Sequence, residues 1–265
     1  MRFVLIGKSL ILHFMKAVKI IKLTLLSTSV IISSFLNAQE LRPFRFGLKA
    51  SPNIGWLKPD TRGINSNGAS LGFNYGLMAE FTLGNSYNYG LGSGVEISTF
   101  SGKLEFPDVV APIDTTLVNS RNSSSYTYRY VEIPFTIRMK TNEIGYNTYF
   151  ANFGVSTSFR VRGRQNISYS LPTGNLNEEN IDVLGEIAPF RFGLILGGGV
   201  EYNFHGKTAL IAGITFNNGF SNIFKKDYYE LNTNGEVLLN NNKPNQTVEQ
   251  KAISNYISLD LGIFF

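Results

Sequence analysis

The chain has 265 residues, of which 24 are basic and 19 are acidic, and it contains two histidines and no cysteine. Five of the basic residues and none of the acidic residues lie in residues 1–38, so residues 39–265 carry 19 basic against 19 acidic side chains and are formally neutral. This balance disfavours nucleic-acid binding, which requires a persistent basic surface. The lack of cysteine excludes a disulfide framework, so hydrogen bonds and packing must hold the fold.

The first 38 residues have the parts of a secretory signal peptide. A basic segment comes first, formed by Lys16, Lys19 and Lys22. An uncharged, largely apolar segment follows over 23–36, and Ala38 is a small residue at the expected cleavage position. The apolar segment is shorter than the roughly 20 residues of a membrane-spanning helix, which disfavours an N-terminal anchor. We therefore predict a cleaved signal peptide over 1–38, with Met15 as an alternative initiator, and a β-barrel domain over 39–265.

After residue 39 apolar and polar residues alternate repeatedly. In the clearest segment, 71–83, every second residue from Leu71 onward is apolar or aromatic, and the residues between them are mostly polar or glycine. A period of two predicts a β-strand and contradicts a helix. The same alternation occurs over 44–51, 89–98, 131–140, 149–160, 190–202, 210–217 and 253–265. The sequence therefore predicts eight strands.

The connections between these strands alternate strictly between short and long. The short ones lie near 84–86, 142–147 and 205–206 and contain residues suited to turns. The long ones cover about 55–68, 101–124, 163–187 and 221–251 and are rich in Asn, Ser, Gly and Pro. Short turns at one end and long loops at the other are typical of an outer-membrane barrel.

Alternation alone leaves two orientations open, because a soluble lipocalin-like barrel would place the apolar face inward. Glycines on the polar face favour the membrane barrel, since they suit the crowded interior of a narrow barrel. Aromatic residues towards strand ends also favour it, as lipid–water girdles: Phe44, Phe46, Tyr87, Tyr89, Tyr126, Tyr128, Tyr130, Phe264 and Phe265. The last residue, Phe265, resembles a C-terminal signal read by barrel-insertion machinery. We predict an all-β fold, an eight-stranded antiparallel up-and-down transmembrane barrel in the bacterial outer membrane, with long loops outward and both termini periplasmic.

In this orientation the polar face forms an interior network of both charge signs. Its predicted members are Lys49, Glu80, Glu96, Glu132, Arg138, Lys140, Arg160, Arg191, Glu201 and Asp260. Opposite charges can pair inside the barrel, which indicates a structural role; a narrow gated ion path is the alternative. An open diffusion pore is disfavoured, because porins use about 16–18 strands.

The residues for common catalytic sites are missing from the predicted barrel domain. His205 is its one histidine and lies in a predicted turn. Without cysteine or a second histidine, Cys–His catalysis, a Ser-His-Asp triad and a histidine zinc site all lack parts. We therefore expect a non-enzymatic protein with no cofactor and no metal.

Three segments resemble those of PorT-family outer-membrane β-barrel proteins of the Bacteroidetes. They are 46–56, 130–140 and 259–265, and the Glu132-Ile133-Pro134 strand is the most specific of them. The resemblance covers the predicted mature chain and implies an outer-membrane location and a small barrel. The family's founding member is associated with type IX secretion and gliding.

These observations predict a barrel with a filled interior that acts in envelope structure or in loop-mediated binding at the cell surface. The alternatives are an accessory component of protein export, similar to type IX secretion, and the soluble lipocalin-like ligand carrier. The expected partners are outer-membrane lipid, the barrel-insertion machinery during biogenesis, and a protein at the surface or in the secretion system, with no nucleic acid.

Overall fold

The computed structural model describes residues 44–84, 88–110, 118–171, 174–205, 208–241 and 243–265. The predicted signal peptide over 1–38, its cleavage site, Met15 and Tyr87 lie outside these residues. Within the described ranges, no helix is long and apolar enough to cross a membrane.

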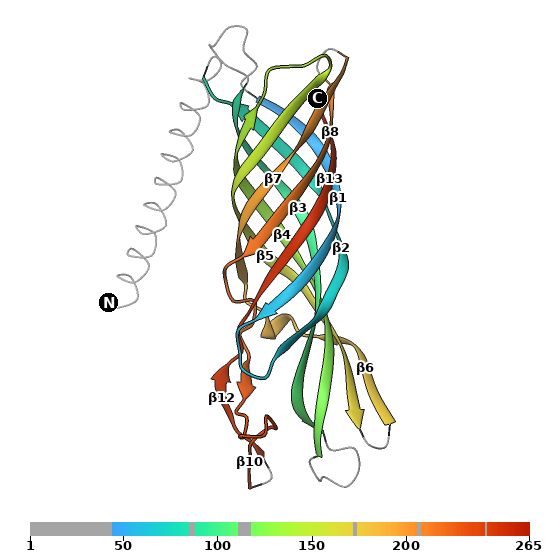
Figure 1. Ribbon diagram of the computed structural model, residues 1–265, viewed down its shortest axis with the longest axis vertical. Helices are drawn as coiled ribbons and strands as arrows, with labels where there is room; N and C mark the ends of the chain where they lie inside the picture. The colour runs from blue at the N-terminus through green and yellow to red at the C-terminus, as the bar shows by residue number, and fades with distance from the viewer. Residues whose placement is uncertain (1–43, 85–87, 111–117, 172–173, 206–207, 242) are drawn as a thin grey trace, which may run out of the picture. The chain divides into compact units, whose positions relative to one another are not determined.

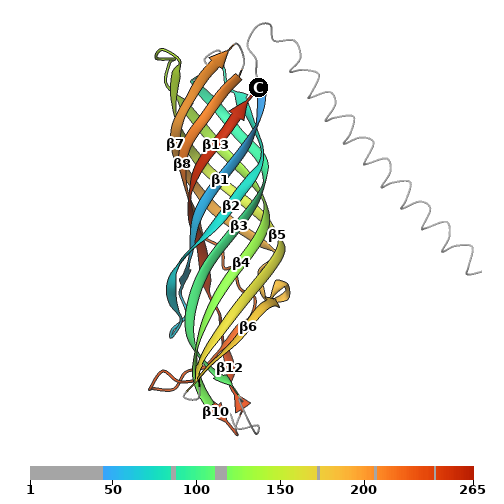
Figure 2. The same cartoon turned by 90° about the vertical axis from the view of Figure 1, so that its right-hand side faces the viewer.

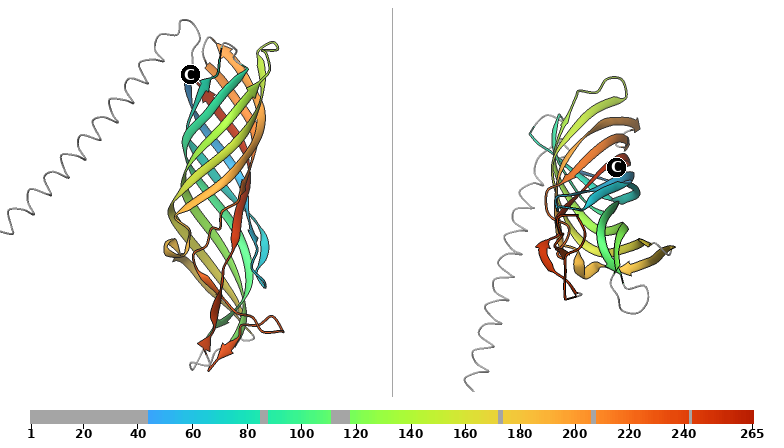
Figure 3. Two further views of the ribbon diagram at one scale, coloured as in Figure 1. Left: turned by 90° about the vertical axis from the view of Figure 1, so that its left-hand side faces the viewer. Right: turned by 60° about the horizontal axis from the view of Figure 1, so that its bottom comes forward.

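Eight long antiparallel strands form a closed ring, shown in Figure 1 and, turned so that its left-hand side faces the viewer, in the left view of Figure 3. The strands are β1 (Phe44–Pro59), β2 (Asn65–Thr82), β3 (Tyr89–Val110), β4 (Val118–Lys140), β5 (Asn147–Leu171), β7 (Phe190–His205), β8 (Thr208–Gly219) and β13 (Ala252–Phe264). Each pairs with the next, and the ring closes where β1 pairs with β13. A closed ring has no free edge, which lipid could not satisfy with hydrogen bonds. The predicted eight-stranded antiparallel barrel is confirmed.

The two ends of the barrel differ. The described parts of the short connections lie at the end that carries the C-terminus, at the top of Figure 1, and Gly84 and Gly145 there adopt the positive φ that glycine tolerates in turns. The other end carries additional elements. These are β6 (Gly174–Asp182), the 3-10 helix η1 (Leu184–Glu186), β9 (Asp227–Tyr229), β10 (Leu239–Asn240), β11 (Lys243–Pro244) and β12 (Gln246–Glu249).

Large apolar side chains cover the outer surface of the ring. Leu77, Phe135 and Leu259 are about half exposed, at 56%, 54% and 49%. A band of this kind is stable in lipid and would be costly in water. The apolar face therefore points outward, the reverse of a soluble ligand carrier, and the lipocalin-like alternative is wrong.

All four predicted loops contain strand, since the short strands β9 to β12 lie within 221–251. β3 continues to Val110, β4 begins at Val118 and β5 runs to Leu171, where loops over 101–124 and 163–187 were expected. β1 and β2 likewise extend into 55–68. Figure 2 shows β4, β5 and β6 running side by side beyond the barrel. These segments remain strands because polar and apolar side chains still alternate along them. The two faces have exchanged polarity, so that the apolar side chains point inward and the polar ones outward.

Strand β4 shows this reversal within a single element. Its outward side chains are apolar from Val131 to Met139, a length that matches the roughly 9–11 residues of a transmembrane strand. From Arg129 back to Asn119 the outward side chains are serine, threonine, asparagine and arginine. The inward side chains change in the opposite sense, from charged and polar to Tyr126, Tyr128 and Tyr130, which are 4%, 1% and 1% exposed. Water replaces lipid as the outer solvent at this level.

The predicted aromatic girdle is therefore only partly correct. Phe44, Phe46, Tyr89 and Phe265 are exposed on the outer surface. The three tyrosines of β4 point inward, however, and so does Phe264, which is 1% exposed. These four residues were wrongly assigned, because even-numbered positions of both strands face the barrel interior.

The reversed part of the barrel encloses an apolar core, and we call this region the cap. Its buried members are Leu57, Ile64, Phe100, Leu104, Phe106, Tyr126, Tyr128, Tyr130, Val183, Ile187, Ile223, Phe224, Tyr228, Ala252 and Tyr256. The connection between β8 and β13 packs onto the β3–β4 hairpin, since Tyr228 donates a hydrogen bond to the Pro107 carbonyl at 2.9 Å. Burial of each large apolar side chain contributes about 1.5–3 kcal/mol. The cap is therefore a packed structure.

Candidate functional site: the interior charge network

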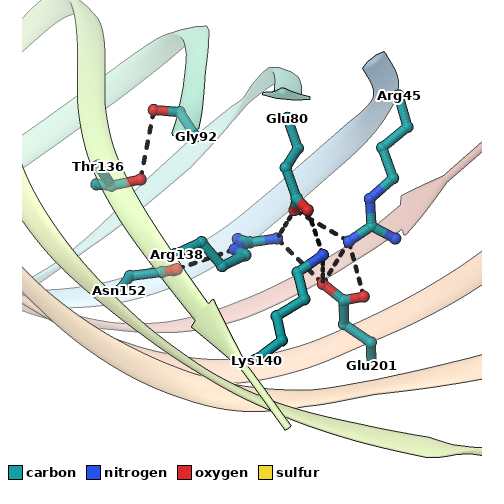
Figure 4. A network of polar contacts seen from close by, with 8 residues as sticks. All are labelled: Arg45, Glu80, Gly92, Thr136, Arg138, Lys140, Asn152 and Glu201. Carbon is teal, nitrogen blue, oxygen red and sulfur yellow. Dashed lines mark hydrogen bonds and ion pairs between the residues drawn. The ribbon is translucent and has the colours of Figure 1, made fainter. Parts of the chain in front are cut away.

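A cluster of five charged residues lies inside the barrel near its short-turn end, and we call it the basal cluster. It consists of Arg45, Glu80, Arg138, Lys140 and Glu201, contributed by strands β1, β2, β4 and β7 (Figure 4). Arg45 Nη2 donates to both glutamates, at 3.0 Å to Glu80 and 2.6 Å to Glu201. Arg138 Nη1 also donates to both, at 2.9 and 3.2 Å. Lys140 pairs with Glu80 and lies 3.5 Å from Glu201.

Aromatic rings complete the surroundings of the two arginines. The Arg45 guanidinium lies 4.0 Å from the centre of the Phe264 ring, and that of Arg138 lies 4.6 Å from Phe150. Each cation–π contact adds about 0.5–2 kcal/mol when water is excluded. Because Glu80 and Glu201 are each only 2% exposed, the cluster is a buried and cross-linked network. It ties strands on opposite parts of the ring together.

A second ion pair lies deeper in the barrel. Lys49 Nζ is 2.8 Å from Glu96 and 3.9 Å from Asp260. Asp260 also accepts hydrogen bonds from Thr215 at 2.6 Å and Ser258 at 2.9 Å. Every one of these side chains points into the interior, so both carboxylates have partners.

The third group surrounds Arg191, which is fully buried beneath the cap. Arg191 donates to the Ser254 hydroxyl at 2.6 Å and to Asn217 Oδ1 at 2.7 Å, and its guanidinium lies 4.5 Å from the Phe100 ring. Asn217 in turn donates to Glu132 at 3.0 Å, so an amide bridges the two charges. Gly193 makes this possible, because a Cβ there would collide with Asn217.

Between the basal cluster and Lys49 the interior contains a cavity of about 70 Å³. Lys49, Glu96, Glu132, Arg138 and Asp260 all contribute to its wall. A single water needs about 10–15 Å³ of such space, so the cavity can hold several waters. In the part of the chain that the structure describes, no group of three or more His, Cys, Asp or Glu residues is arranged to hold a metal ion.

The structure places nine of the predicted network residues in these three groups and one elsewhere. Arg160 instead donates hydrogen bonds to the carbonyls of Leu184 and Ile187, and so fixes η1 to the barrel. Arg45 was missing from the predicted set although it is central to the basal cluster. The sequence did contain the signal, because Arg45 has the same parity as Lys49 on the first strand. The side chain of His205 lies outside the described residues.

The cap contains a partly buried acid, Asp108, on the β3–β4 hairpin. Burial raises the pKa of the Asp108 carboxyl, although hydrogen bonds from Asn122 at 3.0 Å and from the Val109 amide at 2.8 Å oppose the shift. Burial likewise raises the pKa of Tyr169 to about 12. Partial burial within the cap is the main cause of both pKa shifts.

The closed ring, the apolar outer band and the filled polar interior together define a small outer-membrane β-barrel. The chain belongs to the outer membrane protein beta-barrel domain family, whose profile matches residues 37–259.

No curated protein sequence matches the chain. Among solved structures it is similar to Neisserial surface protein A, with 14% identity, coverage of 83% of this chain and 95% of that chain, and a TM-score of 0.34. It is also similar to Ail, the attachment invasion locus protein of Yersinia pestis, in complex with the heparin analogue sucrose octasulfate, with 12% identity, coverage of 84% and 99%, and a TM-score of 0.33. The outer membrane protease OmpT from Escherichia coli has 8% identity, coverage of 86% and 99%, and a TM-score of 0.37.

Proposed function

We propose that this protein is a non-enzymatic outer-membrane barrel, closed to solutes, that presents an ordered cap at the cell surface to bind a protein partner and support the envelope. The observation that carries the proposal is the continuation of β3, β4 and β5 beyond the apolar band around a packed core. A barrel that served only as a membrane anchor would need no such core. The proposed orientation places the cap outside the cell and both termini in the periplasm, as long connections usually face outward.

The interior supports a closed barrel. The basal cluster fills one end, and Arg191 with the aromatic cap residues fills the other. Side chains fill most eight-stranded barrels in this way. The charges are held by ion pairs and hydrogen bonds, which supports a structural role for the network.

The orientation can be tested by labelling, because the chain contains no cysteine. Asn67→Cys, in the exposed part of β2, should react with a membrane-impermeant maleimide on intact cells. Glu143→Cys, in the exposed turn at the opposite end, should react only after lysis. The reverse pattern would contradict the proposed orientation.

The presentation of the cap can be tested by shortening one hairpin. Lys103 and Ser125 are directly paired, so replacing 104–124 with Asn-Gly should give a tight two-residue hairpin. The shortened protein should still be heat-modifiable in the outer membrane. Cells that produce it should lose cross-linked surface complexes and become more sensitive to detergent.

An epitope inserted at Gly145, in a short turn, serves as the matched control and should change neither property. If the shortened hairpin also changed neither property, the cap would not be the functional surface, and the proposal would fail.

The cavity beside Lys49 favours one alternative, a narrow gated ion path through the network. Planar-bilayer recordings test this alternative. The proposed closed barrel should give no discrete current steps. Discrete conductance steps whose size changes in Lys49→Gln would favour the ion path. The export role rests on the PorT-family resemblance alone. Normal secretion and motility in a deletion strain would remove it.

A further inference from the structure

Two arginines face each other on the outer surface of the barrel, at the base of the cap. Arg129 of β4 is paired directly with Arg162 of β5, and both side chains are exposed. Directly opposed residues on one sheet face have Cβ atoms about 4.5–5.5 Å apart, and like charges there destabilise the pair. Neither guanidinium forms an ion pair or hydrogen bond with any described residue. By contrast, the exposed Arg121 on the same strand pairs with Glu105 at 2.7 Å.

A third arginine extends this pair. Arg164 follows Arg162 on the same face of β5 and donates one hydrogen bond to the carbonyl of Asn180 at 2.7 Å, while its Nε is buried without a partner. Asp182 of β6 is paired directly with Arg164 and offsets its charge, so Arg129 and Arg162 carry the excess positive charge of this group. We call the three arginine side chains the arginine patch. An anion that bound there would remove the repulsion.

The level of the patch on the barrel indicates which anion is available. The adjacent pair towards the membrane is Val131 and Phe159, the last lipid-facing pair of these two strands. A register shift in β5 inserts Val161 between this pair and Arg162, and Val161 is 51% exposed. β-Bulges often re-aim side chains next to functional sites. The backbone of the Arg129–Arg162 pair thus lies about two residues, or roughly 7 Å along the strand, beyond the apolar band, which puts the two side chains within reach of lipid headgroups.

We infer that the arginine patch binds the phosphate of a lipid headgroup in the surrounding leaflet. Arginine matches phosphate well, because its planar group donates two parallel hydrogen bonds to the phosphate oxygens. The adjacent Val131, Phe159 and Val161 would contact the first segment of the acyl chains. The bound lipid would thereby fix the height of the barrel in the membrane. Only the assignment of this lipid to the outer leaflet rests on the proposed orientation of the barrel.

The test uses the full barrel in phosphatidylcholine nanodiscs that contain a minor fraction of phosphatidic acid, a lipid with a phosphate-monoester headgroup. Native mass spectrometry then measures which lipid stays bound. The parent should retain phosphatidic acid in preference to phosphatidylcholine. Arg129→Gln/Arg162→Gln should retain about tenfold less, the effect of losing one charge-assisted hydrogen-bonding pair. Arg121→Gln is the matched control and should behave as the parent.

Three results would overturn the inference: no preference in the parent, equal retention by the double variant, or complete displacement of the lipid by inorganic phosphate. The last would assign the patch to a free anion. Heat-modifiability of each variant shows that it is folded. Because both nanodisc leaflets have the same composition, a negative result would leave the proposed orientation and the surface role of the cap unaffected.

Discussion

Neutralising Glu201 is the sharpest perturbation of the basal cluster. In the parent, three cations share two carboxylates, Glu80 and Glu201. In Glu201→Gln the same three cations share one. Removing one partner of a buried ion pair costs about 3–5 kcal/mol. The glutamine amide can still accept one hydrogen bond, so we expect a loss of about 3 kcal/mol, more than a hundredfold in the ratio of folded to unfolded protein.

The single tryptophan, Trp56, provides the assay. It lies on β1 and stacks on Phe216 of β8, with ring centres 6.2 Å apart, so its fluorescence reports separation of the ring. Urea unfolding in lipid vesicles should show a lower midpoint for Glu201→Gln with an unchanged slope. The exposed pair of Glu249 and Lys251 supplies the control, since Glu249→Gln should cost no more than about 0.5 kcal/mol.

A double-mutant cycle tests the reasoning further. Arg45→Gln combined with Glu201→Gln restores the charge balance of the basal cluster, because two cations then share one carboxylate. The double variant should be more stable than the sum of the two single losses predicts, by about 1–3 kcal/mol. Additive losses, or a Glu201→Gln cost as small as that of the control, would refute the account of a coupled network.

Three further outcomes are expected. Tyr128→Ala should destabilise the packing of the cap by about 3–5 kcal/mol. Trypsin should then cleave at Arg129, while the gel mobility of the barrel should still change on heating. Arg191→Lys should lower the urea midpoint by about 2 kcal/mol, because an ammonium group cannot reach Ser254 and Asn217 with the same fork of donors; an unchanged midpoint would contradict this. Because the pKa of Asp108 is raised in the folded state, its contribution to stability is complete at low pH and is lost as the pH rises through that value. Hydrogen exchange should show stronger protection of β3 at about pH 4 than at pH 7, and Asp108→Asn should abolish the difference.

The sequence was sufficient to predict the ring because each strand has lipid on one face and the polar barrel interior on the other. Side-chain polarity therefore repeats every two residues. From Leu71 to Phe81 every second residue is apolar or aromatic and faces outward in the lipid band. The same periodicity continues in the cap, where Tyr126, Tyr128 and Tyr130 alternate with Ser125, Thr127 and Arg129. Those tyrosines share the parity of Glu132, so their inward direction could have been deduced. The assumption that apolar residues always face outward hid it.

The partners in the interior could not be predicted in the same way. The alternation along each strand predicts that Glu80 and Glu201 point inward. It does not give their relative positions along the barrel axis. That Arg45 reaches both depends on the stagger between neighbouring strands, which is set by hydrogen-bond register around the whole ring. The bulge at Val161 is another such feature, and it brings Arg129 opposite Arg162.

Hydrogen exchange of the cap strands tests the central claim most directly, with the barrel in lipid at neutral pH. If β3 and β4 are continuous strands around a packed core, amides over 99–106 and 121–130 should be protected for minutes or longer, like those of the membrane band. If they exchange within seconds while the membrane band stays protected, the cap is a set of open loops. The proposal of an ordered surface structure would then be wrong.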